Sequence, residues 1–260
     1  MEITPSLLKF KWALRLQMPE GAVTGKRHAL YFLYDEGKAA MASRKCTRCG
    51  WIVGHKRDLH DGLCPGCRFE VMIEYAHEAA VEWARQVLAD PGAMVLDTET
   101  TGLDFDDEVV EIAILEVASG KALLNTLIRP TKSIPADVSD IHGITDEEVK
   151  DAPTFLEIYP KLREVLGAAS RCVTYNAEFD ERMLAQSATA HGGTGEMGKL
   201  PEERFQCAME AYAEFVGDWS DKFRSFKYKP LCGGHRALGD CEAVVERLRE
   251  MARGESWRPF

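Results

Sequence analysis

An apolar segment that carries two acidic residues, Met94–Glu99, constrains the fold of this 260-residue chain more than any other feature. Its sequence, Met-Val-Leu-Asp-Thr-Glu, predicts a buried β-strand in which Asp97 and Glu99 point to the same face. Neighbouring buried carboxylates repel each other unless one is protonated, paired with a base or bound to a cation. Because no Lys or Arg lies within ten positions of either residue, a bound cation is the favoured explanation. The alternative is a solvated strand end, where acidic pairs are common.

The residues that follow this strand predict a mixed α/β architecture. Two strands are expected over 109–117 and 121–129, joined as a hairpin at Ser119-Gly120. Apolar residues at helical spacing predict a helix over 155–166, and a short apolar run predicts a strand over 171–175. The remaining expected helices cover 178–188, 202–216 and 239–252. Three strands followed by alternating helices and strands imply a mixed sheet flanked by helices.

Four of the eight cysteines form two Cys-x-x-Cys pairs upstream of this region, and the pairs are Cys46/Cys49 and Cys64/Cys67. Their spacing allows four thiolates to surround one Zn²⁺ tetrahedrally. Disulfides or redox-active thiols are the alternatives. A reducing compartment argues against the first, and the lack of a βαβ context argues against the second. A four-thiolate site has no open coordination position, so the zinc is expected to be structural and to stabilise a segment too short for a large core.

These patterns divide the chain into three parts. A small zinc-ribbon module is expected over 1–74, with a helix over 4–18 and a strand over 28–34. A linker helix is expected over 75–92, its helical turns covering 75–89 before the breaker cluster at 90–92. The remaining residues, 93–260, form the larger domain.

Charge is distributed unevenly along the chain. Residues 1–72 contain 12 Lys or Arg against 7 Asp or Glu, a net charge of +5, whereas residues 73–260 contain 20 against 35, a net charge of −15. Trp51 and a group of basic residues surround the cysteines, which is typical of a surface that binds a nucleic-acid strand. The alternative is a solvated basic face beside a core tryptophan. The basic residues are Arg44, Lys45, Arg48, Lys56, Arg57 and Arg68.

The composition, 45% hydrophobic and 28% charged, is that of a globular protein. No apolar stretch approaches the roughly 18 residues of a membrane-spanning helix, and the first residues lack the basic-then-apolar pattern of a signal peptide. We therefore expect a cytoplasmic protein that does not associate with membranes.

Three further polar residues lie after an expected strand or near the start of an expected helix. Asp180 follows the strand over 171–175, His235 lies in a glycine-rich loop, and Asp240 begins the last helix. With Asp97 and Glu99, they make four acids and one histidine. Carboxylate oxygens without nearby thiolates select Mg²⁺ or Mn²⁺ over Zn²⁺.

Four segments together resemble the DEDDh family of 3′→5′ exonucleases, in that family's order and spacing. The resemblance spans about 95–250 and implies a ribonuclease-H-like mixed β-sheet flanked by helices. The segments are LDTETTGL (96–103), IHGIT (141–145), YNAEFD (175–180) and HRALGD (235–240).

The resemblance implies two Mg²⁺ or Mn²⁺ ions bridged by Asp97, and it makes His235 the general base. In the tyrosine branch of the superfamily, a Tyr four positions before the last Asp replaces the histidine. Here that position is Arg236, so the histidine branch is the better match. The implied reaction releases 5′-mononucleotides stepwise from a free 3′ end. The implied metal ligands are Asp97, Glu99, Asp180 and Asp240.

The resemblance also implies substrate contacts. The residues after the acidic strand would hold the terminal nucleotide through backbone N–H groups and an apolar wedge, although they also suit an ordinary turn. These residues are Thr100, Thr101, Gly102 and Leu103. His142 and Asn176 lie in family motifs too, but His142 also suits a structural role, and Asn176 more often caps the following helix.

A basic and aromatic stretch precedes His235 and suggests phosphate contacts. Part of this stretch could instead form a helix with Phe223 and Phe226 in the core. The basic residues are Lys222, Arg224, Lys227 and Lys229.

Together these features predict a zinc ribbon followed by a metal-dependent 3′→5′ exonuclease that prefers single-stranded DNA 3′ ends. No residue obviously senses a 2′-hydroxyl, so an exoribonuclease or oligonucleotide-trimming enzyme remains an alternative. Another is an adaptor whose ribbon docks on a polymerase, repair or phage assembly, with the nuclease active only there. An inactive nuclease-like fold is disfavoured because all five catalytic positions are filled.

Overall fold

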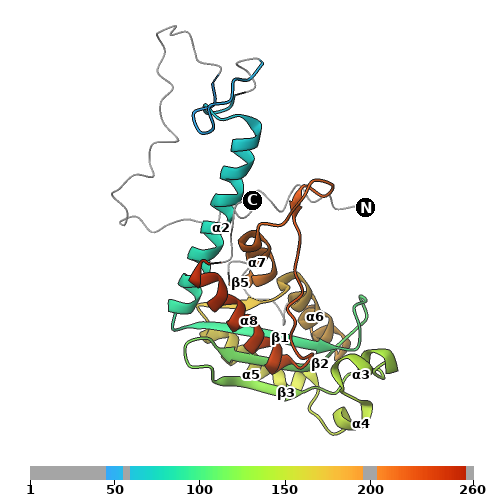
Figure 1. The fold of residues 1–260 in the computed structure, drawn as a ribbon. Helices are drawn as coiled ribbons and strands as arrows, with labels where there is room; N and C mark the ends of the chain where they lie inside the picture. The colour runs from blue at the N-terminus through green and yellow to red at the C-terminus, as the bar shows by residue number, and fades with distance from the viewer. Residues whose placement is uncertain (1–44, 55–58, 196–203, 256–260) are drawn as a thin grey trace. The chain divides into compact units, whose positions relative to one another are not determined.

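The computed structural model describes residues 45–54, 59–195 and 204–255, so the elements expected over 4–18 and 28–34 lie outside the described residues. A five-stranded sheet in the order β3-β2-β1-β4-β5 forms the centre of the fold (Figure 1). Its strands are β1 (Ala93–Thr100), β2 (Val109–Glu116), β3 (Ala122–Leu127), β4 (Arg171–Thr174) and β5 (Phe205–Cys207).

The central strand β1 has neighbours that run in opposite directions. It pairs antiparallel with β2, with Asp97 opposite Ala113, and parallel with β4, with Val95 opposite Val173. β3 extends the antiparallel side, and β5 extends the parallel side. The sheet is therefore mixed, and the expected ribonuclease-H-like fold is confirmed.

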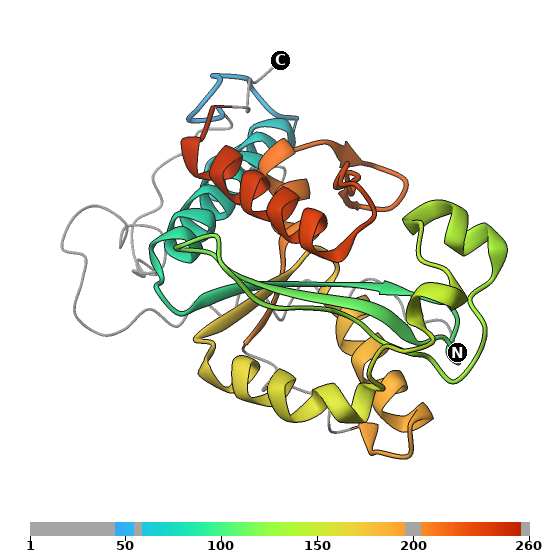
Figure 2. The same cartoon turned by 90° about the horizontal axis from the view of Figure 1, so that it is seen from below.

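Helices cover both faces of this sheet (Figure 2). On one face lie α5 (Phe155–Ala168) and α6 (Ala177–Ala190). On the other lies α8 (Ala237–Arg253), against which α2 (Pro65–Ala89) and α7 (Ala208–Val216) pack. The ranges expected for β2, β3, β4, α5, α6 and α8 agree with the structure to within a few residues. The short helices α3 (Ala136–His142) and α4 (Asp146–Val149) follow β3.

The main core fills the space between the sheet and the α5/α6 layer. Its largest side chains are fully buried: Leu96, Ile112, Ile114, Phe155, Leu162, Met183 and Leu184. On the opposite face, α8 lies directly on the sheet, because the Cys241 thiol is 3.6 Å from the carbonyl oxygens of both Val95 and Ala113. This close approach places the first turn of α8 over β1.

α2 begins at Pro65, ten residues before the expected start. Proline suits the first turn of a helix, because its missing N–H would have no partner there. The apolar run over 69–73 is too short for its periodicity to separate strand from helix. In the structure this run is part of α2, whose packing against α7 and α8 buries Trp83, Ala84 and Val87 further along the helix.

The helix expected over 202–216 is divided in the structure. Residues 205–207 form β5, with Phe205 opposite Cys172 of β4, and from residue 204 onward the helical part of this range is α7, Ala208–Val216. This pairing is non-local, so local periodicity cannot reveal it. The alternative of a helix within 219–229 is wrong, because β6 (Trp219–Ser220) and β7 (Ser225–Phe226) form a hairpin there and Phe223 is 65% exposed.

Among the described residues, no helix combines the length and the hydropathy that crossing a membrane requires.

Candidate metal centre

Three carboxylates from two elements meet on one face of the sheet. Asp97 and Glu99 lie on β1, and Asp240 lies in the first turn of α8. One oxygen from each lies within 4.8 Å of the others. The alternation of β1 puts its two acids on one face, and α8 packs against β1 and β2.

Asp180 approaches β1 from the first turn of α6. Its side chain is buried, and Thr98 Oγ1 donates a hydrogen bond to its Oδ1 over 2.9 Å. The charge of Asp180 raises the pKa of Asp97, so the two carboxyls interact. Asp180 is not one of the three residues whose oxygens lie within 4.8 Å. The structure therefore places it beside that group.

Burial and mutual repulsion raise the pKa values of these acids. Burial, and then Asp180, Asp240 and Glu99, raise the pKa of Asp97 well above its usual range. Burial, and then Asp240 and Glu111, raise the pKa of Glu99 to about 8. Burial likewise raises the pKa of Asp180 to about 7 and that of Asp240 above its usual range. The group therefore retains protons near neutral pH unless a cation takes their place.

The donor atoms fit a hard divalent cation. Within the described chain, Asp240 Oδ1 is buried and has no hydrogen-bond partner. An unsatisfied carboxylate oxygen among other carboxylates is satisfied by Mg²⁺ or Mn²⁺. Cys241 lies next to Asp240, but burial, and then Asp97, raise the pKa of its thiol well above the usual range. It stays a neutral thiol, so the donor set consists of oxygens.

His235 lies in the loop that enters α8, five residues before Asp240. Its side chain is exposed, and its backbone has a φ of +53°, in the left-handed region that non-glycine residues rarely adopt. A charge on His235 lowers the pKa of Asp240, so the imidazole lies within electrostatic reach of this carboxyl.

Glu111 is a further buried acid that sequence reasoning missed. It lies on β2 directly opposite Glu99 and is 5% exposed. Arg236 donates to it from Nε over 3.0 Å and from Nη2 over 2.6 Å, and the backbone N–H of Ala237 donates over 2.9 Å. The available signal was a single carboxylate in the otherwise apolar run Val-Val-Glu-Ile-Ala-Ile-Leu.

The residues after the acidic strand form a loop that is held together internally. Thr100 Oγ1 donates to the carbonyl of Gly102, and Thr101 Oγ1 donates to Asp107, each over 2.7 Å. Both threonine hydroxyls therefore donate hydrogen bonds to other residues of the same loop. Leu103 is 76% exposed, so its side chain is available as the expected apolar wedge.

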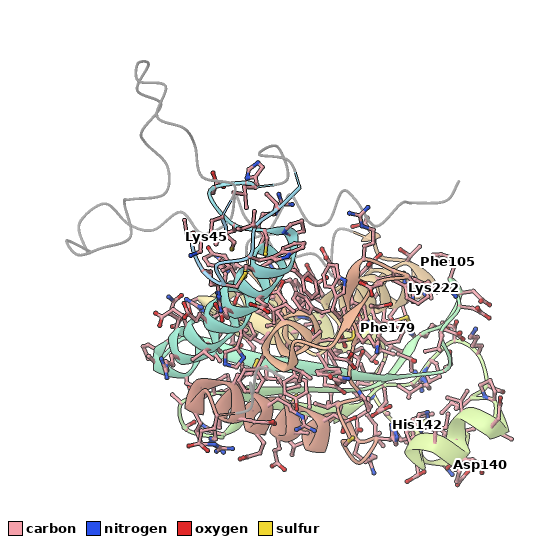
Figure 3. All side chains as sticks on the ribbon, turned by 45° about the horizontal axis from the view of Figure 1, so that its top comes forward. Lys45, Phe105, Asp140, His142, Phe179 and Lys222 are labelled. Atoms are coloured by element: carbon pink, nitrogen blue, oxygen red, sulfur yellow. The ribbon has the colours of Figure 1, made fainter. Side chains whose placement is uncertain are left out.

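His142 is buried on α3 with both ring nitrogens engaged (Figure 3). Its Nδ1 accepts from the N–H of Ile144 over 3.0 Å, and its Nε2 lies 3.2 Å from the carbonyl oxygen of Thr100. Burial lowers the pKa of the ring, which favours the neutral form that donates from Nε2. This arrangement ties α3 to the end of β1 and favours the structural interpretation of His142.

Asn176 is exposed at the start of α6, and its side chain makes no capping hydrogen bond, so the capping interpretation is wrong. It lines a shallow hollow with Glu178, Phe179 and Arg182. The Arg182 guanidinium lies 5.3 Å from the ring centroids of both Phe179 and Phe105, and Phe105 is 88% exposed (Figure 3).

The expected phosphate-binding residues lie on the β6–β7 hairpin and just after it. Lys222 and Arg224 are exposed in the hairpin (Figure 3). Lys227 and Lys229 both pair with Asp218, over 2.9 Å and 2.6 Å. Their charge is therefore partly neutralised within the protein, which the sequence pattern did not reveal.

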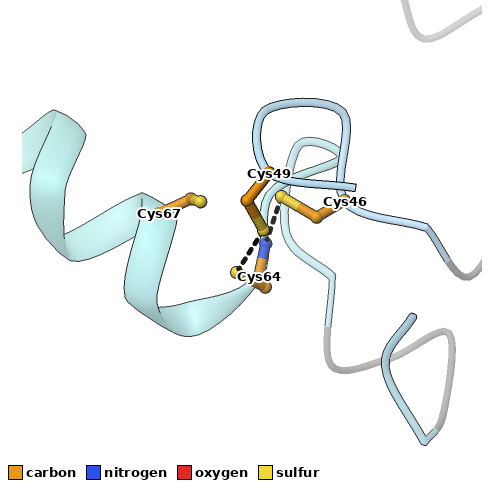
Figure 4. Close-up of side chains that lie close together, drawn as sticks. All are labelled: Cys46, Cys49, Cys64 and Cys67. Atoms are coloured by element: carbon orange, nitrogen blue, oxygen red, sulfur yellow. Dashed lines mark hydrogen bonds between the residues drawn. The ribbon is translucent and has the colours of Figure 1, made fainter. Parts of the chain in front are cut away.

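The four cysteines of the N-terminal pairs converge (Figure 4), and their Sγ atoms lie within 4.8 Å of one another. Cys64 is the residue that precedes α2, and its N–H donates to Cys46 Sγ over 3.4 Å. Backbone N–H donors at Cys49 and Cys64 lower the pKa of Cys46 to about 6, whereas burial raises that of Cys67 to about 12. A bound cation is therefore required to hold all four as thiolates. All eight cysteines are free thiols, so the disulfide alternative is not realised.

The mixed sheet and its acidic centre define a nuclease fold, and comparison with known proteins identifies the class. The exonuclease family model, RNase T, matches residues 94–248, so the chain belongs to this exonuclease family.

A sequence relative agrees with this assignment, and two further proteins are similar to parts of the chain. The uncharacterized exonuclease CP81 of Escherichia phage 186 is 38% identical over 172 residues, which are 61% of this chain and 87% of that protein. The PolC-type DNA polymerase III of Caldanaerobacter subterraneus is 30% identical over 161 residues, 61% of this chain but 11% of the polymerase. The solved structure of exonuclease X in complex with 5′ overhanging duplex DNA is 26% identical, covers 64% of this chain and 94% of that chain, and has a TM-score of 0.42.

Proposed function

We propose that this exonuclease degrades nucleic acid from a free 3′ end, releases 5′-mononucleotides and prefers single-stranded DNA. The observation that carries the proposal is the convergence of Asp97, Glu99 and Asp240, with Asp180 beside them. Asp240 is buried, Asp97 and Glu99 are half-buried, and burial raises the pKa of all three, which a fully solvated acidic patch would not show. The order and spacing of the same residues along the chain match the DEDDh motifs.

Each residue of the proposed site has a distinct role. The four carboxylates, those of Asp97, Glu99, Asp180 and Asp240, would hold two Mg²⁺ or Mn²⁺ ions. Bound there, the ions supply positive charge that polarises the scissile phosphate and acidifies the attacking water. His235, exposed in the loop before α8, accepts the proton of that water at a ring nitrogen. Leu103 packs against the terminal base and directs the strand end toward Asp97 and Glu99.

The cysteine site is proposed to bind one structural Zn²⁺. Its four sulfur donors leave no coordination position for a substrate. α2 runs as one continuous helix from Pro65, next to Cys64, to the part that packs against α7 and α8. We keep the division into a zinc-ribbon module over 1–74, a linker helix over 75–92 and an exonuclease domain over 93–260 as part of the proposal.

The relatives support DNA as the substrate and a partner in replication or phage assembly. A polymerase III of the PolC type and a phage exonuclease both align with the exonuclease region. The chain spans about a tenth of that polymerase. An adaptor that works only within such an assembly would turn over substrate feebly when isolated, and an exoribonuclease would prefer RNA.

Digestion of matched DNA and RNA oligonucleotides by the full chain tests the proposal. With a 5′ label and Mg²⁺ or Mn²⁺, we expect a shrinking ladder. With a 3′ label, we expect immediate release of one labelled mononucleotide. Asp97→Ala should lower the rate by roughly a thousandfold or more, whereas Asp140→Ala, an exposed acid on α3 (Figure 3), should act like the wild type. Cleavage of circular DNA, or a ladder that starts from the 5′ end, would contradict the proposed reaction.

A further inference from the structure

We propose that Arg236 and Glu111 are positioning residues that hold the start of α8, and with it Asp240 and His235, against the metal-binding strand. This inference rests on the proposed function of the same site. The two residues lie 125 positions apart in the chain, and neither coordinates a metal or touches the reacting atoms in the proposed mechanism.

The first observation is the geometry of the contact. Arg236 is the residue that precedes α8, and its guanidinium binds Glu111 through both Nε and Nη2. The same carboxylate accepts the N–H of Ala237, the first residue of the helix. A bidentate ion pair combined with a backbone hydrogen bond restrains both the position and the orientation of the helix start. Asp240 lies one turn further along α8, and Asp240 N–H donates to the carbonyl of Arg236.

The second observation is that Glu111 faces Glu99 across the β1–β2 pair. Two facing carboxylates beside a cation site would both be potential ligands. Arg236 and Ala237 occupy both oxygens of Glu111, so its charge is compensated and its lone pairs are engaged. Because of this ion pair, the Glu99 carboxylate is available to bind a metal ion, whereas the Glu111 carboxylate binds the start of α8.

The third observation is the burial of Glu111. Its side chain is 6% exposed, whereas that of Arg236 is 51% exposed. Removing Arg236 leaves a buried carboxylate without its cationic partner next to other acids, which is unfavourable. Removing both charges avoids that cost, so the two substitutions should be strongly non-additive.

The test uses Arg236→Gln, Glu111→Gln and the double variant in the full chain. For Arg236→Gln we expect kcat on a single-stranded oligonucleotide to fall by about tenfold or more, because a displacement near 1 Å at a reacting group has effects of this size. KM should change by less than about threefold. The double variant should lose no more activity than Arg236→Gln alone. Arg249→Gln, which breaks an exposed ion pair with Glu246 on the same helix, is the matched control and should resemble the wild type.

Binding of Mn²⁺ to the zinc-loaded chain, measured by calorimetry without substrate, supplies a second readout. Both Arg236→Gln and Glu111→Gln release the start of α8, and with it the metal-binding Asp240, so both should weaken Mn²⁺ binding, whereas Arg249→Gln should bind Mn²⁺ like the wild type. Wild-type Mn²⁺ affinity in both folded variants would overturn the inference. Wild-type kcat in both single variants, or a double variant whose loss is the product of the single losses, also overturns it.

Two further arms keep the test decisive. Should Arg236→Gln fail to fold, Arg236→Lys keeps the charge, loses the bidentate geometry and should show the same loss of kcat to a smaller extent. If the wild type digests neither DNA nor RNA, the proposed function fails. In that case the expected loss of Mn²⁺ affinity in both single variants still tests the positioning role.

Discussion

Gly233 lies so close to the Asp240 carboxylate that a side chain at position 233 would force this carboxylate to move. A Cβ built there would stand 2.6 Å from Asp240 Cγ and even closer to Oδ1, well inside van der Waals contact. The loop that carries His235 and the helix that carries Asp240 therefore fit together only because position 233 has no side chain.

We expect Gly233→Ala to displace the Asp240 carboxylate and lower kcat by about a hundredfold, with a much smaller change in KM. Gly234→Ala is a matched control, because a Cβ at Gly234 meets nothing within 4 Å. Steady-state digestion of one oligonucleotide by both variants checks this. Equal kcat values in the two variants would contradict the role of Gly233.

The acidic centre should make the stability of the protein depend on pH when divalent cations are left out of the buffer. The pKa of Glu99 rises from its ordinary 4.5 to about 8 in the folded chain, so the folded state binds more protons than the unfolded state between these values. Stability should therefore fall as pH increases through this window, and Mg²⁺ should reverse the fall.

Thermal unfolding at several pH values, with and without Mg²⁺, measures this effect. Glu99→Gln removes one of the contributing groups and should flatten the metal-free profile. A wild-type Tm that stays constant or increases between pH 5 and 8 without Mg²⁺ would be incompatible with the repulsion described here.

The cysteine cluster should hold one zinc per chain. Cys46→Ser removes the thiolate whose pKa is lowered to about 6, and it should abolish zinc binding. Cys232→Ser, at an exposed cysteine outside the cluster, should retain the metal, as should Asp97→Ala. Metal analysis of the purified variants by mass spectrometry distinguishes these outcomes, and zinc in stoichiometric amount in Cys46→Ser would rule out the assignment.

Leu103 should affect substrate binding without affecting stability. Because its side chain is 76% exposed, Leu103→Ala should change the free energy of unfolding by less than about 0.5 kcal/mol. Loss of its contact with a base should lower kcat/KM by about tenfold. Val71→Ala, partly exposed on α2, is the control for loss of a surface side chain. If Leu103→Ala leaves kcat/KM unchanged on single-stranded and duplex 3′ ends, Leu103 does not contact the terminal base and the proposed wedge is wrong.

His142 should show the opposite behaviour. His142→Ala deletes a buried ring that joins Thr100 to Ile144, and it should lower the free energy of unfolding by about 2–4 kcal/mol. At temperatures where the variant remains folded, its KM should stay within about twofold of the wild type. A large increase in KM with unchanged stability would instead indicate a direct contact with substrate.

The sequence by itself determined those features that depend on local patterns. Alternation along Met94–Glu99 defined a buried strand with Asp97 and Glu99 on one face, and helical spacing defined α5 and α8. The Cys-x-x-Cys spacing likewise identified the cysteine cluster, since two residues between ligands suit a single turn of chain around one ion. These patterns extend over a few residues, so neighbours along the chain are enough to specify them.

Only the tertiary structure decided which distant residues share a site. The ion pair between Arg236 and Glu111, the engagement of Lys227 and Lys229 by Asp218, and the pairing of β5 with β4 all join residues that local periodicity treats separately. Strand register and helix packing set these distances, and both arise from burying apolar surface across the whole sheet. For that reason the charged residues that surround the acidic centre could not be predicted from the sequence and were identified only in the folded structure.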